Sequence, residues 1–123
     1  MHALGLHVLI ELYGCDAQII DQLERVTEAM LEAARRSGAT IISHHLHRFS
    51  PQGISGVVII AESHLAIHTW PEHGYVAADI FTCGERLEAQ EAVDVLKTQF
   101  RAARVEVTRL ARGLTQHLHQ TTD

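Results

Sequence analysis

The chain has 123 residues, of which 46% are hydrophobic and 20% are charged, and its formal net charge at pH 7 is −5. This length suits one domain, residues 1–123, that buries roughly two-thirds of its unfolded surface, and the composition excludes a disordered chain. The acidic balance argues against nucleic-acid and anionic-membrane binding. With no basic, apolar leader and no apolar run of ~18 to 20 residues, we expect a cytoplasmic protein and no membrane partner.

The first third of the chain predicts one strand and one helix. Apolar and mixed residues alternate over Leu4–Leu12, which indicates a strand. Asp16 follows a glycine and is well placed to cap a helix, which Gly38 ends. The buried face of this helix is indicated by apolar residues three and four positions apart: Ile19, Leu23, Val26 and Met30.

The rest of the chain predicts five strands and a second helix. Four short β-rich runs are separated by turn residues around Pro51 and Pro71, and they cover Thr40–Phe49, Gly56–Ala61, Leu65–Trp70 and Tyr75–Thr82. A helix is expected to start near Gly84-Glu85, with Ala89, Val93, Leu96 and Phe100 on its inner face. A last strand covers about Arg104–Leu110, and the polar tail from Arg112 is expected to fray.

This order of elements predicts an α+β fold, a two-layer α/β sandwich in which two helices cover one face of an antiparallel-rich sheet. In the strand Tyr75–Cys83, alternation directs Val76, Ala78 and Ile80 toward the helices. The opposite face then carries Ala77, Asp79, Phe81 and Cys83. Because that face is too apolar to be left fully exposed to solvent, we expect it to pack against a second copy of the chain.

The densest run of reactive side chains lies between Glu62 and His73. If Leu65 and Ile67 face the core, then His64, Ala66, His68 and Trp70 share the other face of their strand. Ser63 beside His64 is compatible with a nucleophile and its base, but a polar edge strand explains the same residues and is the commoner case.

The histidines and cysteines leave alternatives open. His45 and His47 project to one side of a strand, next to His44, yet no zinc-type spacing occurs and no metal site is predicted. Cys15 and Cys83 form no C-x-x-C pair, so neither a disulfide nor a thiolate site is indicated. Cys83, at a strand end before a helix, suits either a small buried residue or a reactive thiol.

Three segments together resemble the bacterial and archaeal S-adenosylmethionine decarboxylases. They are E-L-Y-G-C-D at Glu11–Asp16, E-S-H-L-A-I-H-T-W-P-E at Glu62–Glu72, and D-I-F-T-C-G at Asp79–Gly84. Their order and spacing match the family from about Gly5 to the second helix, and the likeness weakens in the last strand and tail. The middle motif is long and irregular, so chance explains it poorly.

The resemblance implies a self-processing proenzyme. The serine that matches Ser63 attacks the carbonyl of Glu62, and elimination from the resulting ester cuts the chain into 1–62 (beta chain) and 63–123 (alpha chain). Ser63 becomes a covalent pyruvoyl group, whose carbonyl forms a Schiff base with the substrate amine and takes up the electrons of decarboxylation. The expected reaction converts S-adenosylmethionine to its decarboxylated form and CO2 for spermidine synthesis.

The resemblance also implies roles for individual residues. In processing, His68 matches the base and Ser55 the residue that stabilises the intermediate. In catalysis, Cys83 matches the acid that protonates the α-carbon after CO2 leaves. Phe49 matches the aromatic ring that stacks on adenine. Glu72 matches the carboxylate that binds the ribose hydroxyls, and Leu65 and Trp70 border the same pocket. The family pairs through its sheets into an α-β-β-α homodimer, with sites between the sheets and Phe49 reaching in from the partner chain.

Two alternatives remain. The same pyruvoyl chemistry serves arginine or ornithine in related enzymes, although Phe49 and Glu72 favour a nucleoside substrate. A homologue that dimerises or binds metal without cleaving is the other alternative.

Overall fold

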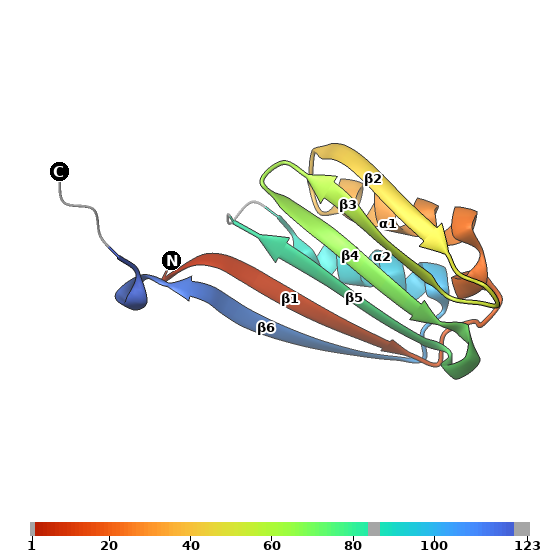
Figure 1. Cartoon of the computed structure of the whole chain (residues 1–123). Coiled ribbons are helices and arrows are strands. Elements are labelled where there is room, and N and C mark those ends of the chain that lie inside the picture. Colours follow the sequence, from red (N-terminus) through yellow and green to blue (C-terminus); the bar gives the residue numbers. More distant parts are fainter. Residues whose placement is uncertain (1, 84–86, 120–123) are drawn as a thin grey trace.

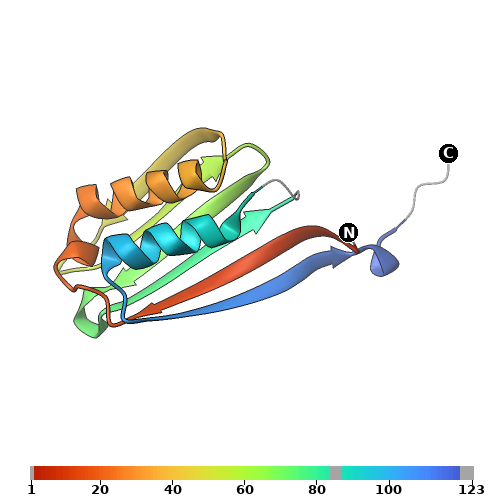
Figure 2. The ribbon, with the colours of Figure 1, turned by 180° about the vertical axis from the view of Figure 1, so that it is seen from behind.

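The computed structural model describes residues 2–83 and 87–119, and these form a six-stranded antiparallel sheet covered on one face by two α-helices (Figures 1 and 2). The strands are β1 (Ala3–Tyr13), β2 (Ile41–Arg48), β3 (Ile54–Ile60), β4 (Ser63–Trp70), β5 (Tyr75–Thr82) and β6 (Arg104–Leu114). The helices are α1 (Leu23–Arg36) and α2 (Ala89–Phe100). The strand order is β2-β3-β4-β5-β1-β6, which confirms the two-layer α+β prediction.

The core lies between the sheet and the helices, and the strand pattern explains why. Along β5, Val76, Ala78 and Ile80 are buried while the alternate residues are half-buried, so the predicted division of this strand between two faces is confirmed. Leu65 and Ile67 of β4 are also buried, as expected. Both helices turn an apolar stripe to this layer, and Phe100 at the end of α2 is fully buried.

The first helix differs from the expectation at its start. Asp16 caps a short 3-10 turn, η1 (Ile19–Asp21), because its Oδ1 accepts hydrogen bonds from the backbone N–H groups of Gln18 and Ile19 at 3.0 and 3.1 Å. The α-helix begins only at Leu23, with no side-chain cap. The buried residues of η1 dock against the core first, so the chain makes an extra turn before α1.

The C-terminal expectation was wrong in one respect. The last strand continues to Leu114, because β1 pairs with it along its whole length, from Tyr13↔Arg104 to Ala3↔Leu114. The backbone N–H of Thr115 then donates to the carbonyl of His2 at 2.9 Å. The expected helix start at Gly84-Glu85 lies outside the described residues, and α2 begins at Ala89.

The other face of the sheet carries no helix, as the view in Figure 1 shows. We call it the open face. It bears half-exposed aromatic and apolar side chains, including Tyr13, Phe49, Ile59 and Trp70, together with several histidines. No helix within the described ranges is long and apolar enough to cross a membrane.

Candidate active site

The first set of site residues lies at the β3–β4 hairpin. Ile60 pairs with Ser63, so Ala61 and Glu62 form a two-residue turn, and Glu62 has φ +64°. This left-handed conformation costs a residue with a side chain about 1 kcal/mol. Ser63 shares the parity of Leu65, and its Oγ is a buried atom without a hydrogen-bond partner among the described residues. The Glu62–Ser63 peptide therefore joins a strained residue to a free hydroxyl.

Cys83 lies at the same end of the strands as the β3–β4 turn. Because His64 pairs with Phe81, Ser63 lies level with the end of β5, and Cys83 follows immediately. Its thiol belongs to an exposed residue with no disulfide. We call Glu62, Ser63 and Cys83 the hairpin cluster.

The other cysteine has a structural environment. Cys15 is buried, and this burial raises the pKa of its thiol to about 11. Its Sγ lies 3.6 Å from the carbonyl oxygen of Leu12, to which it donates. A thiol that stays protonated in the core is a poor nucleophile. Cys83, in contrast, is exposed.

The second set of site residues lies at the far end of β4. Ser55 of β3 pairs with His68 of β4, and Ser55 Oγ lies 2.8 Å from His68 Nδ1 on the open face. A cavity of about 220 Å³ adjoins this pair. Its walls include Phe49, Gln52, Trp70 and Glu72. We call Phe49, Ser55, His68, Trp70 and Glu72 the pocket cluster.

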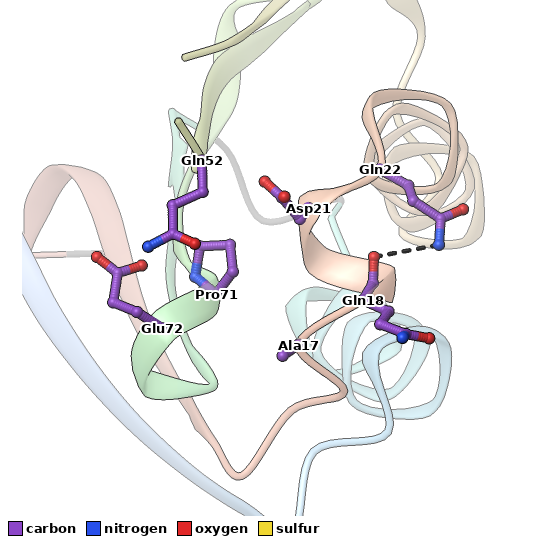
Figure 3. A pocket seen from close by; sticks show the side chains of 7 residues that line it. All are labelled: Ala17, Gln18, Asp21, Gln22, Gln52, Pro71 and Glu72. Atoms are coloured by element: carbon purple, nitrogen blue, oxygen red, sulfur yellow. Dashed lines mark hydrogen bonds between the residues drawn. The ribbon is translucent and has the colours of Figure 1, made fainter. Parts of the chain in front are cut away.

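A second cavity, of about 410 Å³, lies on the other side of Gln52 and Glu72. Figure 3 shows those two side chains with Pro71 on one wall, and Ala17, Gln18, Asp21 and Gln22 on the opposite wall. The lining includes two carboxylates and three amides.

The two clusters are far apart in one protomer. His68 follows Ser63 by five residues on an extended strand, which separates their Cα atoms by roughly 17 Å. The resemblance assigned both clusters to one active site between two sheets, and a single protomer does not bring them together. Ser55 and His68 are out of reach of Ser63 within the same protomer.

Leu65 and Trp70 lie on opposite faces of β4. Leu65 is 1% exposed and packs in the core against the helices, whereas Trp70 is 39% exposed on the open face. The side chain of Leu65 therefore cannot line a pocket on the open face. Any contact of Leu65 with a ligand there would have to come from its backbone.

The open face also carries a charged group that sequence reasoning noted only in part. Asp79 accepts a hydrogen bond from His7 Nε2 at 2.7 Å and lies 3.8 Å from His64 Nε2. The rings of both histidines contact Phe81, and the Arg112 guanidinium lies over the same ring. Alternation along β5 correctly placed Asp79 and Phe81 here, but their partners on β1 and β6 had no local signal.

An aromatic row continues the pocket cluster across the sheet. Trp70 stacks on Tyr75 with ring centroids 5.2 Å apart, and Tyr75 stacks on Tyr13 at 5.4 Å. The Tyr75 hydroxyl donates to the carboxylate of Glu11. Burial and this hydrogen bond raise the pKa of Tyr75 to about 12, so its hydroxyl remains a donor.

The histidines of β2 do not assemble a metal site. The described part of the chain holds no group of three His, Cys, Asp or Glu residues that could bind a metal ion. His44, His45 and His47 are exposed on an edge strand. The ring of His47 contacts the ring of Phe49, with centroids 4.6 Å apart.

Comparison with known proteins gives a consistent result. The family model for S-adenosylmethionine decarboxylase matches residues 6–113. An S-adenosylmethionine decarboxylase proenzyme from Moorella thermoacetica is 54% identical over 114 residues, which cover 93% of this chain and 91% of that protein. One from Pseudomonas aeruginosa (strain LESB58) is 53% identical over 114 residues, 93% of this chain and 71% of that protein. The crystal structure of the adenosylmethionine decarboxylase from Aquifex aeolicus superposes with a TM-score of 0.85 at 39% identity, over 98% of this chain and 100% of that one. The resemblance carried by the sequence motifs is thus confirmed, and this chain belongs to the S-adenosylmethionine decarboxylase family.

Proposed function

We propose that this chain is a self-processing proenzyme whose mature form decarboxylates S-adenosylmethionine. The products are CO2 and decarboxylated S-adenosylmethionine, the aminopropyl donor for spermidine synthesis. Family membership supports the substrate and the proenzyme state. The observation that carries the mechanism is the Glu62–Ser63 junction, where a positive φ precedes a buried hydroxyl that has no hydrogen-bond partner in residues 2–83 and 87–119.

Processing uses the chain's own atoms. Ser63 Oγ attacks the carbonyl carbon of Glu62, and the amide nitrogen of Ser63 leaves, so the peptide becomes an ester. A base then removes the α-proton of Ser63 while its Cβ–O bond breaks, which releases Glu62 as a carboxylate at the end of fragment 1–62. Water hydrolyses the remaining enamine, expelling ammonia and leaving a pyruvoyl group at the start of fragment 63–123.

The junction suits this chemistry for two reasons. Among the residues that the structure describes, Ser63 Oγ has no hydrogen-bond partner that it would have to release before attack. The left-handed conformation of Glu62 is relieved when the chain is cut, so the strain favours cleavage. Only a β-hydroxyl or thiol can make the acyl shift and then be eliminated, and serine supplies the hydroxyl.

The residues of the hairpin cluster also fit the mature site. The pyruvoyl group supplies, once formed, an electrophilic carbonyl that takes up the electron pair left when CO2 departs. The exposed thiol of Cys83 follows β5 at the same edge of the sheet. We assign Cys83 as the acid that returns a proton to the α-carbon of the product.

The pocket cluster fits the nucleoside part of the substrate. Phe49 offers a half-exposed ring for stacking on adenine, and Trp70 borders the same cavity. Glu72 offers carboxylate oxygens to the ribose hydroxyls. A carboxylate and aromatic faces also suit the positive charge of a sulfonium centre.

Neither cluster is a complete site, so we propose that two protomers complete each other. The cavity of about 220 Å³ is smaller than the ~300 to 1,000 Å³ typical of ligand pockets. If two open faces pack about a two-fold axis, the pocket cluster of one protomer lies against the hairpin cluster of its partner. Ser55 and His68 then assist cleavage in the partner chain, and the assembly is an α-β-β-α dimer with two sites.

The activity is tested by release of labelled CO2 from carboxyl-labelled S-adenosylmethionine, with arginine and ornithine as parallel substrates. We expect release from S-adenosylmethionine alone. Release from arginine or ornithine without release from S-adenosylmethionine would transfer the same chemistry to another substrate. A purified chain that stays full length and inactive would support the homologue that does not cleave.

Three substitutions separate processing from catalysis. Ser63→Ala should remain full length and inactive, and His68→Ala should process slowly. Cys83→Ala should cleave normally and lose most decarboxylase activity. Cys15→Ala is the matched control, because its thiol is buried and donates to the carbonyl of Leu12, and it should cleave and turn over like the wild type.

A further inference from the structure

The loop Phe49–Gly53 presents Phe49 to the cavity, and a group outside the loop holds it there. Phe49 is 47% exposed, so burial of its own ring does little to fix its position. The backbone N–H of Phe49 donates to the carbonyl of Gly53 at 2.8 Å, which joins the two ends of the loop. These ends are in turn hydrogen-bonded to another part of the chain.

Asp21 makes this tie. Its Oδ1 accepts a hydrogen bond from the backbone N–H of Gly53 at 2.9 Å, and its Oδ2 accepts one from Arg48 Nη2 at 2.7 Å. Arg48 also donates from Nε to the backbone carbonyl of Asp21 at 3.0 Å, and its Nη2 lies 3.4 Å from the carbonyl oxygen of Pro51. Arg48 and Gly53 stand on either side of Phe49, so both ends of the loop are fixed to one carboxylate.

The carboxylate is itself anchored to the core. Asp21 ends η1, in which Ile19 and Ile20 are 5% and 0% exposed. Hydrogen bonds from Arg48 and Gly53 lower the pKa of Asp21, so it is ionised at neutral pH. A charged, doubly bonded acceptor on a buried turn is a rigid support for the loop.

We propose that Asp21 and Arg48 are positioning residues that hold Phe49 ready for the nucleoside of the substrate. Asp21 does not line the cavity of about 220 Å³ and faces the neighbouring one, across from Gln52 and Glu72 (Figure 3). It therefore acts through the loop. This inference rests on the proposed function, because it assumes that the pocket cluster binds a nucleoside.

The expected effect is on binding. With the loop fixed in advance, the substrate does not have to order Phe49 when it binds. Asp21→Asn keeps the shape but removes the charge, and Arg48→Met removes the donors. Each variant should weaken nucleoside binding about tenfold, the equivalent of one charge-assisted hydrogen bond. KM for S-adenosylmethionine should rise by a similar factor with kcat nearly unchanged.

The chain offers a probe that needs no turnover. Trp70 is the single tryptophan, and it borders the cavity with Phe49. Quenching of its fluorescence by 5′-methylthioadenosine reports the dissociation constant of the nucleoside, even in a protein that releases no CO2. Processing is checked by intact mass, and thermal unfolding is followed so that binding is measured well below the melting temperature.

A matched control removes an equivalent ion pair elsewhere. Glu91→Gln breaks the exposed pair between Arg36 and Glu91, 3.1 Å apart on the two helices, and should bind the nucleoside like the wild type. Arg48→Lys keeps the charge beside Asp21 but loses the forked geometry, and should give an intermediate affinity. The Asp21→Asn/Arg48→Met double variant should bind no more weakly than either single variant, since all three lose the same contact.

The outcomes are distinct. Single variants that bind the nucleoside as tightly as the wild type would overturn the positioning role. A double variant whose fold-loss in affinity equals the product of the two single fold-losses would overturn it as well. So would an equal loss in Glu91→Gln, or a wild type that binds no nucleoside. A wild type that binds the nucleoside but releases no CO2 from S-adenosylmethionine would refute the proposed activity and leave the positioning role intact.

Discussion

A pair of inactive variants should restore activity when they share a dimer, if each site combines the two clusters from different protomers. The first variant, Cys83→Ala, damages the hairpin cluster. The second, Phe49→Ala/Glu72→Gln, damages the pocket cluster. In a hybrid dimer, one site collects both defects and the other collects none.

The size of the effect follows from the geometry. Ser63 and His68 are separated by roughly 17 Å on β4, so a monomer cannot complete its own site. Loss of a base–aromatic stack and a carboxylate–hydroxyl bond together costs ~2.5 to 6 kcal/mol, or about 60-fold to 20,000-fold in kcat/KM. Random pairing makes half the dimers hybrid with one intact site each, so the unfractionated mixture should show about a quarter of wild-type activity and the purified hybrid dimer about half.

The assay co-expresses the two variants with different affinity tags, purifies the doubly tagged dimer and measures CO2 release from S-adenosylmethionine. The control pairs two defects in the same cluster, Cys83→Ala with Ser63→Ala, in which every site stays damaged. No recovery in the first hybrid, or equal recovery in the control, would refute the two-protomer site. A protein that sediments as a monomer while fully active would refute it as well.

Three further predictions concern the fold and the cleavage junction. Leu65→Ala should lower the free energy of unfolding by about 2 to 5 kcal/mol in chemical denaturation, because Leu65 is 1% exposed, whereas Ile42→Ala, 63% exposed, should change it little. Glu62→Gly removes the strain of a positive φ and should slow cleavage about fivefold. Intact mass spectrometry follows the cleavage, and Ala61→Gly is the control. An unchanged cleavage rate in Glu62→Gly would contradict the role of strain. The raised pKa of Tyr75 means that the unfolded chain releases this proton near the ordinary value of 10 and the folded chain only at about 12, so stability should fall between these pH values. Tyr75→Phe should flatten that decline in pH-dependent denaturation, and an unchanged slope would contradict it.

Local periodicity carried the prediction of the fold. Alternation along β4 and β5 correctly separated the buried Leu65 and Ile67 from His68 and Trp70, because the side-chain period of a strand is a local property. The C-terminal strand was predicted too short for the opposite reason. The segment Ala111–Leu114 contains an arginine and a glycine and shows no clear alternation, and it is ordered by backbone pairing with β1.

The candidate site was predicted as a set of residues and not as an arrangement. The family resemblance assigned Ser63 and His68 to one reaction, but an extended strand separates them within a single protomer. The tie between Asp21 and Gly53 joins residues 32 positions apart, in segments that carry no shared motif. The free hydroxyl of Ser63 and the positive φ of Glu62 depend on packing and turn geometry, which no residue pattern reveals.

The central claim is that the chain cuts itself before Ser63 and converts that serine to a carbonyl. Intact mass spectrometry of the active, folded protein tests it most directly, with Ser63→Ala measured alongside. We expect two fragments, residues 1–62 and 63–123, with a downstream fragment that has no free amine and reacts with a hydrazine. An active preparation in which the wild-type chain is full length and carries no such carbonyl would contradict the account.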